Sequence, residues 1–129
     1  MNQEMRELLY EVCQLMKEIH NWIDQAGDDP DAMSNLFHNG PEGRVVSMLS
    51  DPVQRIEMLR IARYSMSTLI FHLLAMIDEK RELGNSNIIA TLVLLKNGVP
   101  VDYPPMLHEC FGTAMIELGF DETWYKLSL

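Results

Sequence analysis

Apolar residues recur at three- and four-residue steps along the first part of the chain, which is the spacing of one face of an α-helix. The positions in this stripe are Met5, Leu8, Leu9, Val12, Leu15, Met16, Ile19, Trp22 and Ile23. The pattern predicts a helix over residues 3–26, with acidic residues near its N-terminus and Gly27 as its stop. We expect the apolar stripe to face a protein core.

The next segment is dense in residues that interrupt regular structure. Residues 28–31 read Asp-Asp-Pro-Asp, which predicts a turn that also caps a short helix at about 31–38. Residues 39–43 read Asn-Gly-Pro-Glu-Gly and predict a loop, and a short apolar segment follows at 45–49. These residues connect the first helix to the longest one.

The helix with the clearest start in the sequence begins at residues 50–52. There, Ser-Asp-Pro supplies a cap and then a proline in the first helical turn. The helix is predicted to run over about 52–82. Its first half is amphipathic, and the residues expected to face inward are Val53, Ile56, Leu59 and Ala62. Its second half, 66–77, is apolar nearly all round, which predicts that protein surrounds it at the centre of the fold.

Residues 85–103 admit two interpretations. The apolar run at 88–95 could form a helix that ends at Gly98, or it could form a strand of a β-hairpin. The Asn97-Gly98 pair is typical of a tight hairpin turn, and the β-branched content also favours the hairpin, near 89–103. Pro100 would then confine the second strand to an edge.

A final helix is predicted over about 105–118, ended by Gly119, and the tail at 123–129 could add a strand or pack across the bundle. We therefore expect a mainly α, compact single domain over residues 1–129. Three to five helices would pack around the 52–82 helix, with a possible small hairpin near 89–103.

The net charge of the chain limits the classes of molecule that it is expected to bind. The 129 residues include 19 acidic and 10 basic side chains, a net charge of −9. Such a chain repels nucleic-acid phosphates, so no nucleic acid is expected as partner. Residues 1–42 alone carry a net −7, which favours either a solvated surface or a docking face for a basic protein. The proposed contact residues are Asp24, Asp28, Asp29, Asp31 and Glu42.

The cellular compartment of the protein is predicted from three features: the N-terminal sequence, the length of the apolar runs and the cysteines. The polar, acidic start is not that of a signal peptide, and the apolar run at 66–77 is shorter than the ~20 residues that a membrane span needs. Cys13 and Cys110 lie in apolar, helix-like stretches without a Cys-x-x-Cys motif, so free thiols are expected. These features favour a cytoplasmic protein that does not bind a membrane.

A search for metal and cofactor motifs gives no candidate. None of the four histidines has a second histidine four residues later or a glutamate three residues earlier. His20 and Asp24 do share a helical face, a step that is common on any polar surface. Neither a phosphate-binding glycine loop nor a nucleophile elbow is present. We therefore predict no metal, no cofactor and no catalytic residue.

His72 is the most informative polar residue because it interrupts the apolar half of the long helix. Thr68 lies four residues earlier, Ser65 seven residues earlier and Glu79 seven residues later, which makes one polar line along the helix. A buried imidazole there would need a hydrogen-bond partner, for which Thr68 is suitable. The alternatives are a satisfied core histidine and a pocket formed by Tyr64, Thr68 and His72.

The sequence favours a non-catalytic, acidic protein-binding domain. Small size, charge and the lack of catalytic motifs suggest a bacterial immunity or inhibitor protein that neutralises a basic toxin, effector or nuclease. The first alternative is a small-molecule binder or enzyme with a pocket around His72. The second is a homo-oligomeric structural or regulatory helical protein, in which methionine-rich stripes form a homodimer core.

Overall fold

The computed structural model describes residues 1–28 and 51–126. The short helix predicted at 31–38, the loop at 39–43 and the apolar segment at 45–49 lie outside the described residues, as does the end of the tail. Within the described part the fold is mainly α-helical with one small antiparallel sheet, which confirms the predicted fold class.

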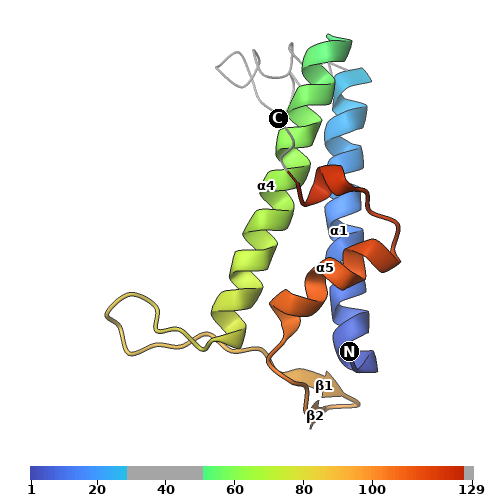
Figure 1. Cartoon of the computed structure of the whole chain (residues 1–129). Helices are drawn as coiled ribbons and strands as arrows, with labels where there is room; N and C mark the ends of the chain where they lie inside the picture. Colours follow the sequence, from blue (N-terminus) through green and yellow to red (C-terminus); the bar gives the residue numbers. More distant parts are fainter. Residues whose placement is uncertain (29–50, 127–129) are drawn as a thin grey trace.

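Two long helices lie side by side and run in opposite directions, as Figure 1 shows: α1 (Gln3–Asp28) and α4 (Pro52–Asp78). The predicted cap of α4 is confirmed, because Asp51 Oδ1 accepts hydrogen bonds from the backbone N–H groups of Val53 and Gln54. The helix ends at Asp78, earlier than the predicted 82. Lys80 turns the chain out of the helix with a φ of 51°.

The third helix, α5 (Leu107–Glu117), packs across both long helices. It ends as predicted at Gly119, whose φ of 78° lies in the left-handed region. The Gly119 N–H bonds the carbonyl of Ile116, and the Phe120 N–H bonds the carbonyl of Met115, which together form a Schellman cap. The cap returns the chain towards α4, where η1 (Glu122–Trp124) packs.

Residues 94–101 form the hairpin that the Asn-Gly pair favoured. Strand β1 (Leu94–Lys96) pairs antiparallel with β2 (Val99–Val101), and Leu95 faces Pro100. Asn97 and Gly98 have φ values of 53° and 79°, so both turn residues adopt the left-handed conformation that a primed turn needs. The helical alternative for this segment is therefore wrong.

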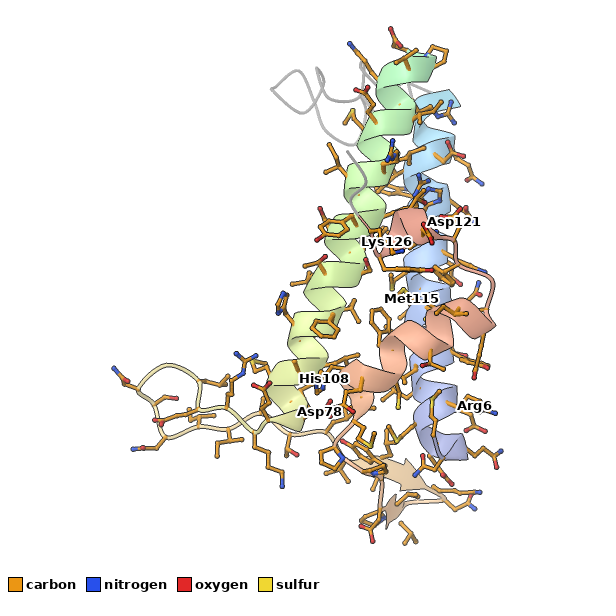
Figure 2. The ribbon with its side chains drawn as sticks, in the orientation of Figure 1. Arg6, Asp78, His108, Met115, Asp121 and Lys126 are labelled. Atoms are coloured by element: carbon orange, nitrogen blue, oxygen red, sulfur yellow. The ribbon has the colours of Figure 1, made fainter. Side chains whose placement is uncertain are left out.

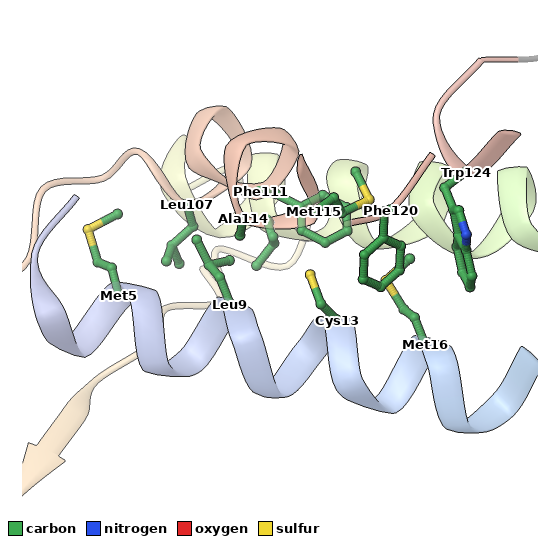
Figure 3. Close-up of a cluster of buried hydrophobic side chains, with 11 residues drawn as sticks. Met5, Leu9, Cys13, Met16, Leu107, Phe111, Ala114, Met115, Phe120 and Trp124 are labelled. Atoms are coloured by element: carbon green, nitrogen blue, oxygen red, sulfur yellow. The ribbon is translucent and has the colours of Figure 1, made fainter. Parts of the chain in front are cut away.

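The main core lies between α1, α5 and η1, with α4 closing one side (Figure 3). Met5, Leu9 and Cys13 of α1 point towards α5 from successive turns, and Met16 lies beside Phe120 and Trp124. Each fully buried large side chain contributes about 1.5–3 kcal/mol of transfer free energy. The buried residues of the core are Met5, Leu9, Cys13, Met16, Leu74, Leu107, Phe111, Ala114, Met115, Phe120 and Trp124.

The long helix α4 is not enclosed by protein, so that part of the prediction is wrong. Leu69, Phe71 and Leu73 are exposed within the segment that is apolar all round, and among the residues expected to face inward Val53 and Ile56 are exposed too. The reason is that α5 has only 11 residues and crosses α4, so it covers one side of it.

The stripe of α1 is likewise wider than the surface that its neighbours bury. The exposed members of that stripe are Leu15, Ile19 and Trp22. Hydrophobic periodicity therefore predicted α1, α4 and α5, and it overestimated the burial of α1 and α4.

Candidate functional site

A cleft of about 420 Å³ lies between α4 and α5, with Tyr125 beyond η1 as part of its wall. Its volume falls within the ~300–1,000 Å³ range of small-molecule sites. Buried Phe111 and Met115 belong to its lining, and exposed Phe71 and Ile116 lie at its surface. The other lining residues are Tyr64, Ser67, Thr68, His72, His108, Glu109 and Gly112.

Gly112 helps to keep this cleft open. A Cβ atom built at Gly112 meets no other heavy atom within 4 Å, so the space next to its backbone is unfilled. Its backbone is ordinary helix, without the positive φ found at Gly119. A larger side chain at this position therefore has room to enter the cleft.

Tyr64, Thr68 and His72, which the sequence grouped as a possible pocket, line this same cleft. The expectation that His72 is buried is wrong, because its side chain is exposed, with its ring edge-on to Phe71 at 5.6 Å between centroids. Tyr64 and Thr68 are half-buried. That these three residues bind a ligand remains a prediction.

Sequence reasoning missed one polar pair of the cleft region, Asp78 and His108. Asp78 Oδ2 lies 2.9 Å from the backbone nitrogen of His108 and 2.5 Å from its Nδ1 (Figure 2). The carboxylate is only 2% exposed, whereas the His108 side chain is 20% exposed and lines the cleft. The two residues are 30 positions apart, so no local motif could have revealed the pair.

The same contact explains how α5 begins. Met106, the N-cap of α5, makes no side-chain capping bond, and Asp78 bonds a backbone N–H of the first turn from the neighbouring helix. A carboxylate is favourable there because unpaired N–H groups and the helix dipole attract negative charge. Asp78 thus fixes both the start of α5 and the ring of His108.

The acidic contact residues predicted from charge are described only in part. Asp29, Asp31 and Glu42 lie outside the described residues, and Asp28 is the last residue of α1. The Asp24 carboxylate binds the Arg55 guanidinium, with Oδ1 2.9 Å from Nε and 2.7 Å from Nη2. Part of the negative charge at this end of α1 is therefore compensated within the chain.

His20 and Asp24, the pair that shares a helical face, are held by separate arginines. His20 Nε2 lies 3.0 Å from Nη1 of Arg63, and Asp24 binds Arg55. Over residues 1–28 and 51–126, no group of three or more His, Cys, Asp or Glu side chains could hold a metal ion. None of the helices in these ranges is long and apolar enough to cross a bilayer.

Both cysteines are free thiols, as predicted, but their surroundings differ. Cys13 is buried against α5, and burial raises the pKa of its thiol to about 11. Cys110 is half-buried. A raised pKa keeps Cys13 protonated at neutral pH, so it acts as a small core residue and not as a nucleophile.

A second hollow, of about 480 Å³, lies between the first turns of α1 and the hairpin. Glu4, Glu7 and Glu11 line it, together with aliphatic residues and Lys96. It holds no aromatic side chain and no histidine. The α4–α5 cleft is therefore the better candidate site, because it combines aromatic walls with two imidazoles.

Comparison with known proteins adds no family assignment: no protein-family model, curated protein or solved structure matches this chain.

Proposed function

We propose that this chain is a small-molecule binding protein whose ligand occupies the α4–α5 cleft. The single observation that carries the proposal is a cleft of about 420 Å³ in which aromatic and aliphatic side chains surround a few polar groups. This composition is typical of ligand sites, where apolar walls supply affinity and a few polar atoms supply orientation.

The exposure of the cleft walls supports the proposal. Phe71 is 41% exposed and Ile116 is 62% exposed, although both lie beside a well-packed core. An apolar ligand between them would remove this surface from water, and each Å² buried contributes about 25 cal/mol. The cleft floor, formed by Phe111 and Met115, is already buried and therefore preorganised.

The test is a titration of the protein with propylbenzene, followed through the methyl NMR signals of Met115 and Ile116. We expect saturable shifts at these two residues and none at Met5, which lies in the core away from the cleft. The absence of saturable shifts, or shifts spread evenly over all methionines, would contradict the proposal.

Two variants of one residue provide the matched control. Gly112→Phe places a ring in the space next to α5 and should abolish the shifts. Gly112→Ala also replaces the glycine, but its single methyl group leaves most of the cleft empty. This variant should retain the shifts. Circular dichroism checks that both variants fold. Equal binding by both folded variants would place the ligand elsewhere.

Binding of a basic protein through the acidic residues of 1–42 remains a separate prediction from charge. Of its contact residues, Asp24 is the one whose carboxylate the structure describes, and Arg55 already binds it. No distance or burial in the described residues favours this function over the cleft.

A further inference from the structure

The imidazole of His108 has a fixed orientation, which determines what the cleft offers a ligand. An ionised carboxylate can only accept hydrogen bonds, so Nδ1 of His108 must be the donor to Asp78 Oδ2. The adjacent backbone N–H donates to the same oxygen. In the neutral ring the proton is therefore on Nδ1, and the lone pair is on Nε2.

Contacts on the ring restrict its rotation further. The Phe71 ring stands edge-on to His108, with centroids 5.5 Å apart and planes at 74°. Asp78 is buried on the Nδ1 side, so Nε2 lies on the opposite edge of a ring that lines the cleft. The site thus holds a positioned hydrogen-bond acceptor beside aromatic walls.

The charges around this acceptor disfavour an anionic ligand. Among the residues that line the cleft there is one carboxylate, Glu109, and no lysine or arginine. The nearest Glu109 oxygen lies 4.0 Å from Nε2 of His108. A ligand carboxylate or phosphate would meet this charge without any cation to offset its desolvation.

A ligand ammonium group is also disfavoured, although it could donate a hydrogen bond. The Glu109 side chain is 58% exposed, so water screens its attraction for a cation. An ammonium group would lose part of its strong hydration against the apolar side chains of Phe71 and Ile116. A neutral hydroxyl group loses much less.

We infer that the cleft takes a neutral phenol or apolar alcohol, whose hydroxyl group donates a hydrogen bond to Nε2 of His108. Its hydrocarbon part lies against Phe71, Phe111 and Ile116. This inference rests on the proposed function and specifies its ligand class. Asp78 is a positioning residue, which acts by holding the His108 ring and its proton.

The experiment compares four probes that share one hydrocarbon skeleton: 4-propylphenol, propylbenzene, 4-propylbenzoate and 4-propylbenzylamine. Dissociation constants are measured by NMR at the Met115 and Ile116 methyl groups. We expect the phenol to bind about tenfold more tightly than propylbenzene, since one net hydrogen bond is worth up to about a factor of ten. The benzoate should bind most weakly.

The two histidines of the cleft provide the matched variants. His108→Leu should reduce the affinity for 4-propylphenol to that for propylbenzene, while His72→Leu should leave the preference for the phenol intact. If His108→Leu does not fold, the imidazole ¹⁵N signals of the wild-type protein replace it. Binding of the phenol should shift Nε2 of His108, and binding of propylbenzene should not.

The outcomes separate the two proposals. Equal affinity for phenol and propylbenzene contradicts the hydroxyl inference and leaves apolar ligand binding standing. Tighter binding of the benzoate or the amine also overturns the inference, as does a phenol preference that survives His108→Leu. Failure of all four probes to bind refutes the proposed function and this inference together.

Discussion

The two sides of α5 show how differently one short helix can be used. The side that faces α1 is filled: Leu107 and Ala114 are 0% exposed, and Phe111, which also forms part of the cleft floor, is 1% exposed. The side that faces the cleft carries Gly112, which has no side chain, and Ile116, which is 62% exposed. The first side belongs to the buried core, and the second side lines the cleft.

The difference arises from what each neighbouring helix presents. Helix α1 offers Met5, Leu9 and Cys13 from successive turns, and these pack directly against α5 (Figure 3). Helix α4 offers a buried carboxylate, Asp78, at its end and exposed Phe71 about two turns earlier. Buried polar groups need hydrogen-bond partners, and a glycine supplies no side chain to fill space. The surface between α4 and α5 therefore does not pack as tightly as the one between α1 and α5.

The largest expected effect is on the filled side. Phe111→Ala should lower the free energy of unfolding by about 3–5 kcal/mol, because it removes a buried ring and leaves a cavity. Ile116→Ala, five residues later on the exposed side, should change it by about 0.5 kcal/mol or less. Urea denaturation measures both. Similar losses in the two variants would contradict the contrast between the two sides.

A loss of stability of intermediate size is expected at Asp78, which bonds the first turn of α5. Asp78→Ala should cost about 2–3 kcal/mol of unfolding free energy, since it removes the charged acceptor of two His108 donors. The control is Glu79→Ala, the next residue, whose ion pair with Arg81 is more than half exposed and should contribute little. Equal denaturation midpoints for Asp78→Ala and wild type would show that the contact carries no stability.

The smallest effects should have opposite signs at the two glycines of this region. Gly112→Ala should stabilise the protein by up to about 1 kcal/mol, because alanine is a better helix former and its Cβ enters open space. Gly119→Ala should destabilise it by about 1 kcal/mol, since φ is 78° there. Thermal unfolding at one pH compares them. Shifts in the same direction would mean that the backbone at one of these positions differs from the structure.

Local sequence signals predicted three features that depend on neighbouring residues. Asp51 and Pro52 predicted the start of α4, Gly119 predicted the end of α5, and Asn97-Gly98 predicted the hairpin turn. In each case the backbone conformation or the bonding of an N–H group requires a particular residue type. Such requirements can be read without knowing the fold.

Burial was predicted less well, because it depends on which elements meet. The apolar segment of α4 was expected to be enclosed, yet Leu69 and Leu73 are exposed, and His72 with them. Tyr64, Thr68 and His72 were grouped because they lie on one predicted helix, and the three do line one cleft. His108 and Asp78 were not anticipated, since their contact joins residues from two different helices.

By itself, the sequence determined that α1, α4 and α5 form, the N-cap of α4, the C-terminal cap of α5 and the hairpin turn, because these follow from interactions within a few residues. The tertiary structure decided which apolar surfaces are buried, where the cleft lies, and that Asp78 orients His108. These features depend on the angle at which α5 crosses α4 and on the space beside Gly112. Neither the crossing nor the space is encoded in any single segment, because each exists only once separate helices have packed.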